Sequence, residues 1–218
     1  MAVKSYSQVG EDLQIAYFIG RGADVRYIDV GCLWPVQHSN SYYFYERGGS
    51  GLCIDPNPTV GDEYRETRPR DVFVNCGIGA EAGMMTYVMH ENPVFNTFST
   101  QRAAEVARKA EKRPGGRTMT GTVEVAIKPL AQVVAETGFA ERVEGRVDFL
   151  SIDVEGFELD VIRGFDFGVL RPKLIVTEHL RGKADAVEDA EIVKVMAGHG
   201  YWVGGYTGHD LYFLDERA

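Results

Sequence analysis

Short apolar runs that each end in a polar residue or glycine recur along the chain, and they constrain its fold more than any other feature. Three come early, at residues 27–31, 51–55 and 71–75. Runs of this length predict strands that are buried on both faces, as in a parallel sheet. Residues 39–48 and 59–67 lie between these runs and are typical of helices. The early part of the chain therefore predicts a βαβαβ unit.

The rest of the chain continues the alternation of strands and helices. Further strands are expected at residues 83–90, 122–127, 147–152 and 173–177. Further helices are expected at residues 103–113, 129–137, 157–163 and 184–197, and Val187, Ile192 and Met196 would share one face of the last helix. Residues 201–206 and 211–214 predict a closing hairpin. This order predicts an α/β fold, a doubly wound sheet with one antiparallel edge strand.

The chain has the size and apolar content of one domain. Its 218 residues are 44% hydrophobic, which favours a single unit over residues 1–218. The strands and helix at about 83–127 form an insert within that unit, interrupted by Pro-Gly-Gly at 114–116. We expect residues 95–120 to order over the site when ligand binds, and their basic residues to favour an anionic acceptor.

The net charge and the absence of signal-like apolar runs indicate which partners and which compartment to expect. The net charge of −9 argues against a surface that binds nucleic acid or anionic lipid, so a small-molecule partner is expected. The start of the chain lacks the apolar core of a signal peptide, and no run reaches the roughly 20 apolar residues of a membrane span. A cytoplasmic protein is therefore predicted. Cys32, Cys53 and Cys76 lack paired spacing and are read as reduced packing residues.

The run at 147–158 indicates where a site lies. An apolar strand ends there in Asp153 and Glu155, and such carboxylates are costly unless they meet a ligand, a metal ion or a helix N-terminus. In open α/β sheets, ligands bind beyond the carboxyl ends of the strands. The other strand-end residues are Asp29, Gly31, Asp55, Asn75, Gly77, Glu178 and His179.

The first two strand ends indicate the class of cofactor. Asp55 follows the second strand, where an acidic residue commonly binds a ribose diol. After the first strand the chain has only Gly31, whereas a dinucleotide fold needs several glycines to admit a pyrophosphate. A nicotinamide cofactor is therefore disfavoured, and a cofactor with ribose and adenine but no phosphate, such as S-adenosylmethionine, fits better.

At this point the chain resembles the FkbM-type S-adenosylmethionine-dependent methyltransferases. The matching elements are residues 6–12, 27–31, 39–40, 51–58, 151–158 with Gly164, and 171–178, in family order. The resemblance implies a class I methyltransferase fold, which is a Rossmann-like seven-stranded sheet with an antiparallel C-terminal hairpin. It also implies O-methylation of a hydroxyl on a sugar, glycoconjugate or natural product.

The resemblance also implies roles for particular residues. Asp29 and Gly31 would lie by the methionine part of the cofactor, Asp55 by its ribose, and Asn75 and Gly77 by its adenine. Gln8, Asn40, Pro56 and Asp153 are the remaining cofactor-binding candidates. The chain departs from the family at residues 32–34, where it has Cys, Leu and Trp.

Methyl transfer to a hydroxyl needs help with the acceptor proton. Asp153, Glu155 and His179 are the catalytic candidates. Direct help by a general base is one reading. In the other, a divalent cation such as Mg²⁺ is held by Asp153, Glu178 and His179.

Structural readings of the same residues stay open. Asp29 can cap a loop, Asp55 can serve a turn, and Glu155 or Asp153 can cap the helix near Phe157. Gln8, Glu11 and Asp12 can belong to a solvated helix start with Ser7 as N-cap, and residues 75–77 can form an ordinary loop. At the level of function, a noncatalytic S-adenosylmethionine-binding module and a nicotinamide-type oxidoreductase remain alternatives. The oligomeric state is left open, with an oligomer allowed.

Overall fold

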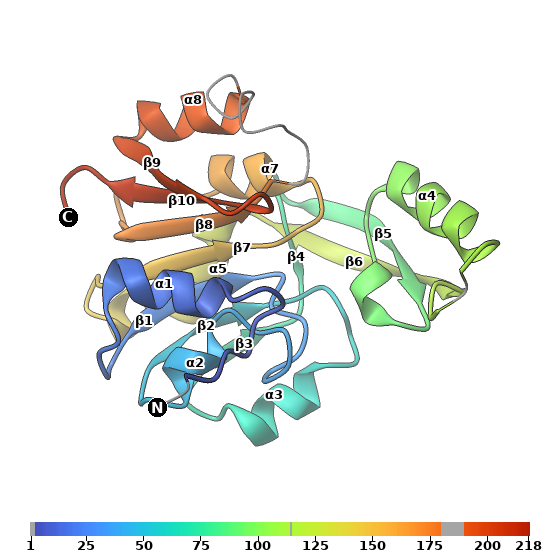
Figure 1. Ribbon diagram of the computed structural model, residues 1–218, viewed down its shortest axis with the longest axis horizontal. Helices are drawn as coiled ribbons and strands as arrows, with labels where there is room; N and C mark the ends of the chain where they lie inside the picture. Colours follow the sequence, from blue (N-terminus) through green and yellow to red (C-terminus); the bar gives the residue numbers. More distant parts are fainter. Residues whose placement is uncertain (1–2, 114, 180–189) are drawn as a thin grey trace.

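A computed structural model describes residues 3–113, 115–179 and 190–218 of the chain. Its main sheet has seven strands (Figure 1). They are β1 Arg26–Val30, β2 Ser50–Ile54, β3 Val72–Val74, β7 Phe149–Ile152, β8 Leu174–Glu178, β9 Tyr201–Tyr206 and β10 Asp210–Asp215. Each lies where the apolar runs predicted a strand, with bounds shifted by at most two residues.

The strand order is β3-β2-β1-β7-β8-β10-β9, and the strands from β3 to β8 run parallel. This confirms the predicted doubly wound sheet with a C-terminal hairpin. The expectation of an antiparallel edge strand is wrong in its placement. The antiparallel strand β10 lies between β8 and β9, one position in from the edge, because both of its neighbours pair with it. The amino end of β10 therefore lies beside the carboxyl end of β8.

Helices cover both faces of the sheet (Figure 1). They are α1 Glu11–Ile19, α2 Tyr42–Tyr45, α3 Gly61–Thr67, α5 Leu130–Thr137, α6 Phe139–Arg142, α7 Glu158–Arg163 and α8 Glu191–Gly198, whereas α4 Thr100–Ala110 lies in the insert, away from this sheet. The sequence predicted all of these except α6 and α1, and for α1 it offered only a helix start near Glu11 as an alternative reading. Residues 184–189 of the last predicted helix, with Val187, lie outside the described residues.

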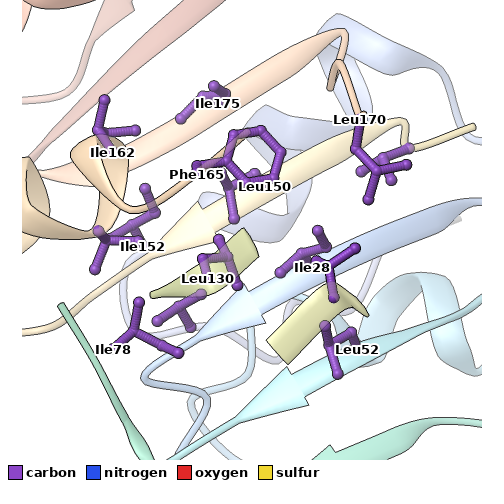
Figure 2. Packing of buried hydrophobic residues seen from close by; sticks show 14 of the residues in the cluster. Ile28, Leu52, Ile78, Leu130, Leu150, Ile152, Ile162, Phe165, Leu170 and Ile175 are labelled. Carbon is purple, nitrogen blue, oxygen red and sulfur yellow. The ribbon is translucent and has the colours of Figure 1, made fainter. Parts of the chain in front are cut away.

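Alternate residues of the central strands face opposite sides of the sheet. On β1, Ile28 and Val30 belong to a core cluster that α5, α6, α7 and α8 cover, whereas Tyr27 belongs to a second cluster that α1, α2 and α3 cover. Figure 2 shows the first cluster, with Leu130 and Phe165 packed close to the strand residues. The three cysteines are buried and unpaired, as predicted. The alternation places Asp29 on the same side of β1 as Tyr27.

The predicted insert forms a separate small sheet that extends away from the main sheet (Figure 1). It comprises β4 Gly77–Ile78, β5 Gly83–His90 and β6 Met119–Lys128, in the order β4-β6-β5, with α4 and the short 3₁₀ helix η1 Pro93–Phe95 between β5 and β6. That the whole chain acts as one domain stays a prediction. Within the described residues, no helix has the length and apolar character needed to cross a bilayer.

Candidate functional site

Three adjoining cavities lie at the carboxyl edge of the main sheet. Cavity A is lined by Gln8, Val9, Glu11, Asp29, Gly31, Cys32, His38, Asn40, Ser151, Ile152, Asp153, Val176, Glu178, His209 and Asp210. Cavity B is lined by Gln8, Gly31, Leu33, His38, Asp55, Pro56, Tyr87, Pro93, Val94, Asn96, Thr97, Phe98, Asp153, Val154 and Glu155. Cavity C is lined by Ser99, Gln101, Arg102, Glu105, Glu155, Gly156, Phe157, Glu158, Glu178 and His179.

The cavities meet at three carboxylates. Asp153 lines both A and B, Glu155 lines both B and C, and Glu178 lines both A and C. These residues follow or end β7 and β8, the strands beside the point where the strand order reverses. Of the predicted site residues, Gln8, Asp29, Gly31, Asn40, Asp55, Pro56, Asp153, Glu155, Glu178 and His179 each line at least one cavity.

Gly31 is required by a close approach between two strand ends. Its φ is 80°, and a Cβ placed there would lie 1.8 Å from the backbone oxygen of Asp153. No residue with a side chain fits at that position. The single glycine that the sequence offers after β1 therefore packs the β1 turn against the end of β7, and this leaves Asp153 at the junction of cavities A and B.

Asp29 lies in a buried network of hydroxyl groups. Its carboxylate accepts a hydrogen bond from the Ser41 hydroxyl at 2.5 Å, and Ser151 supplies a second hydroxyl. The Asn40 amide donates to Ser151 at 3.0 Å. Burial raises the pKa of Asp29, and the bond from Ser41 opposes that rise. Asp29 therefore serves the loop before α2, as its structural reading predicted, and it also lines cavity A.

Asp55 combines a turn role with a place on cavity B. Its two carboxylate oxygens accept the backbone N–H groups of Leu33 and Asn57, each at 2.8 Å. Burial raises the pKa of Asp55 to about 6, while these two bonds lower it. Each oxygen keeps a further lone pair, which is free for a ligand in cavity B.

Asn75 and Gly77 line none of cavities A, B and C, but they support this region. The Asn75 amide donates to the backbone oxygens of Asp55 and Asn57 at 2.8 and 2.9 Å, so it holds the turn after β2. A Cβ at Gly77 would lie 2.5 Å from the Ile127 side chain, so the glycine serves the packing of the small sheet. Their predicted contact with adenine stays a prediction.

The start of the chain is pinned by Asp12, which is fully buried. Its carboxylate accepts from the hydroxyls of Ser5 and Ser7 and from the backbone N–H of Tyr6, at 2.7 to 2.9 Å. A helix does start at Glu11, but the solvated reading is wrong for Glu11 and Asp12, which are buried, and holds only for the exposed Gln8. The N-cap of α1 is Gly10 and not Ser7, because Ser7 is engaged by Asp12. The pinned segment carries Gln8 into the walls of cavities A and B.

Cavity A is strongly acidic. Five carboxylates line it and no lysine or arginine does: Glu11, Asp29, Asp153, Glu178 and Asp210. Desolvation and the negative charges of neighbouring carboxylates raise the pKa values of Asp153 and Glu178. Burial raises the pKa of Asp210 to about 6. A cationic ligand would relieve this repulsion, so the lining suits a cation.

The acidic lining predicts a stability cost that depends on pH. Glu178 has a raised pKa in the folded state, so folded protein binds more protons than unfolded protein above about pH 4.5, and stability falls as the pH rises. Glu178→Gln removes this loss. At pH 8 the ligand-free variant should be more stable than wild type by roughly 1 kcal/mol, the scale of one pKa unit, and the gain should shrink towards pH 4.

Chemical denaturation of both proteins from pH 4 to pH 8 measures this difference. Glu63→Gln, on the exposed surface of α3, is the matched control and should show no such trend. A Glu178→Gln protein that is less stable than wild type at pH 8 would contradict the electrostatic argument.

Cavity C differs from cavity A in carrying a cation. Arg102 of α4 forms a salt bridge with Glu155, so this side chain ties the insert to the end of β7. His179 also lines cavity C, and its Nε2 atom is buried without a hydrogen-bond partner among the described residues. The basic residues in the last turn of α4, Arg108 and Lys109, do not line it.

The predicted Mg²⁺ site at Asp153, Glu178 and His179 finds no support. Within the described part of the chain, no three His, Cys, Asp or Glu side chains gather closely enough to hold an ion. His179 faces cavity C, whereas Asp153 faces cavities A and B. Two of the three intended ligands thus face different spaces.

The structure adds site residues that the sequence did not single out. His38, with φ of 57°, lines cavities A and B, and Asp210 lines cavity A opposite Glu178. Cavity B is closed by the insert through Tyr87, Asn96 and Phe98. Asp210 begins the antiparallel strand β10, so a search confined to the carboxyl ends of parallel strands misses it. No sequence signal marks His38.

A family model and solved structures are similar to this chain. The Methyltransferase FkbM domain matches residues 22–203. A solved precorrin-6y C5,15-methyltransferase from Geobacter metallireducens GS-15 is similar at a TM-score of 0.48 and 12% identity, over 99% of this chain and 94% of that chain. A methyltransferase from Geobacter sulfurreducens is similar at a TM-score of 0.43 and 10% identity, over 96% of this chain and 79% of that chain. No curated protein sequence matches significantly.

Proposed function

The chain belongs to the FkbM methyltransferase domain family and is an S-adenosylmethionine-dependent methyltransferase, and from this premise we propose that it methylates a hydroxyl of a sugar, glycoconjugate or natural product. The observation that carries the proposal is the meeting of the acidic cavities A and B with cavity C at Asp153, Glu155 and Glu178. The family membership replaces the two alternatives, a nicotinamide-type oxidoreductase and a noncatalytic binding module.

Cavities A and B fit the cofactor. Bound S-adenosylmethionine supplies an electrophilic methyl group, and its methionine end carries a sulfonium, an ammonium and a carboxylate, which sum to one positive charge. Cavity A is lined by five carboxylates and by no lysine or arginine. This lining supports cavity A as the place where the positively charged end of the cofactor binds. In cavity B, Asp55 has lone pairs for the ribose hydroxyls, and Pro56, Tyr87 and Phe98 offer apolar surface for the adenine.

Cavity C fits the acceptor. Its volume of about 560 Å³ lies in the range of small-molecule sites. Ser99, Gln101 and the carboxylates offer hydrogen-bonding groups for a polyhydroxyl ring, and Phe157 offers an apolar face. The lining has four glutamates, and its one arginine is already paired with Glu155. We therefore replace the anionic acceptor expected from sequence with a neutral or cationic one.

Asp153 is the residue suited to take the acceptor proton. It lies where the cofactor cavities meet, and its raised pKa makes its carboxylate a stronger base than an ordinary aspartate. Glu155, held by Arg102, and Glu178 stand between Asp153 and cavity C. They would orient the acceptor hydroxyl towards the methyl group, which an in-line displacement requires. His179 in cavity C remains a candidate contact for the acceptor.

Removing the charge of Asp55 should weaken cofactor binding. We expect Asp55→Asn to cost roughly 1–3 kcal/mol of binding free energy for S-adenosylhomocysteine, the range for losing a charged hydrogen-bond partner. Isothermal titration calorimetry measures the loss. NAD should bind to neither protein, since the turn at Gly31 lacks the glycines that admit a pyrophosphate. Unchanged affinity in the variant would remove Asp55 from the site.

The proposed reaction is tested by an acceptor screen. S-adenosylmethionine with a labelled methyl group is incubated with the enzyme and panels of neutral, amino and acidic sugars and hydroxylated natural products. We expect label on the oxygen of a neutral or amino acceptor, located by mass spectrometry. Transfer to nitrogen or carbon, or only to acidic acceptors, would overturn the proposal.

A further inference from the structure

Arg68 is a buried cation between α3 and β3, and it lies outside every sequence element that indicated the site. Its side chain is fully buried. The guanidinium pairs with Asp71 at 2.7 Å and donates to the Tyr27 hydroxyl at 3.0 Å. It also donates to Ser39 at 3.2 Å and to Ser41 at 2.9 Å, the two serines that flank Asn40. Arg68 therefore holds the loop that brings Asn40 into cavity A.

The donors and acceptors fix the direction of the hydrogen bond at Ser41. A guanidinium has only donors, so the Ser41 oxygen accepts from Arg68 and its single proton is free to be donated. Ser39 already accepts from the Tyr42 N–H at 3.0 Å and from Arg68. Its lone pairs are thus occupied, and the Ser41 proton points to the Asp29 carboxylate.

A second hydroxyl is directed in the same way. The Asn40 amide donates to the Ser151 oxygen at 3.0 Å, which leaves the Ser151 proton for its bond with Asp29. Both hydroxyls next to Asp29 are therefore donors. Two hydroxyl donors favour the ionised carboxylate over the protonated acid, against the cost of burial.

We propose that Arg68 is a positioning residue of the cofactor site, which acts through Ser41 to keep Asp29 an anion for the ammonium group of the cofactor's methionine moiety. The proposal rests on the proposed placement of the cofactor in cavities A and B. The charged groups that face Asp29 are Arg68 and Asp71 from the α3–β3 turn, Asp55 after β2 and Asp153 after β7. Among these, Arg68 is the only cation.

The test compares two ligands that differ at the methionine end. S-adenosylhomocysteine has the ammonium group, whereas 5′-methylthioadenosine keeps the adenosine and lacks it. We expect Ser41→Ala to weaken S-adenosylhomocysteine binding by about tenfold at pH 7, the scale of a hydrogen bond to a charged group, and more at pH 6 than at pH 8. Binding of 5′-methylthioadenosine should change less than twofold. Arg68→Lys should show the same selective loss.

Ser39→Ala is the matched control, because Ser39 contacts Arg68 in the same loop but not Asp29. It should leave the affinity ratio of the two ligands at the wild-type value. If Ser41→Ala weakens both ligands equally or neither, the positioning role is overturned even when Arg68→Lys fails to fold. If wild type binds neither ligand, the proposed cofactor placement fails instead.

Discussion

Asp153→Asn is expected to lower the turnover of methyl transfer by about 10²–10⁴, the range for removing a positioned acid–base group. Asn keeps the size of the side chain and removes its charge. Desolvation and the charge of Glu155 raise the pKa of Asp153, so its carboxylate takes up a proton more readily than an ordinary aspartate does. The affinity for S-adenosylhomocysteine and the folded structure should change little, because no backbone group depends on this carboxylate among the described hydrogen bonds.

Single-turnover kinetics with an acceptor from the screen measures this loss. Asp160→Asn on α7 makes the same chemical change outside the cavities, beside its partner Arg163, and should keep wild-type turnover. The ratio of variant to wild type should also be the same with and without a chelator, since the described carboxylates do not group as a metal site. An Asp153→Asn enzyme that turns over at the wild-type rate would remove Asp153 from the chemistry.

The sequence predicted the strand-end residues because their signal is local. An apolar run that stops in a carboxylate can be recognised from a few residues. Asp29, Asp55 and Asp153 were recognised in this way, and all three line the cavities. The same locality limited their interpretation. Asp29 and Asp55 each serve a loop and line a cavity, so the structural and functional readings were not alternatives.

The residues that the sequence missed depend on pairing between distant segments. Asp210 reaches cavity A because β10 inserts antiparallel beside β8, which places it opposite Glu178. Arg102 reaches Glu155 from a helix of the insert. The metal hypothesis failed on the same ground, since His179 lines cavity C whereas Asp153 lines cavities A and B, although both follow neighbouring strands.

The largest stability effect is expected at Asp71, the partner of the buried Arg68. Its carboxylate has no solvent exposure and accepts from Arg68, from the Tyr27 hydroxyl at 2.9 Å and from the backbone N–H of Gly51 at 2.8 Å. Asp71→Asn leaves the guanidinium buried without its countercharge and sets an amide donor against it. We expect a loss of about 3–5 kcal/mol in the free energy of unfolding, the range for breaking a buried ion pair.

Urea denaturation followed by circular dichroism measures the effect. Asp24→Asn is the control, because Asp24 pairs with Arg26 and Arg146 on the surface and should cost about 1 kcal/mol or less. Adding Arg68→Met to Asp71→Asn removes the unpaired charge and should restore part of the lost stability, since the apolar side chain needs no partner. A double variant less stable than Asp71→Asn would contradict this expectation. It would show that the hydrogen bonds of Arg68 to Tyr27, Ser39 and Ser41 stabilise the fold by more than its unpaired charge destabilises it. The buried cation would then stabilise the loop before α2 even without Asp71.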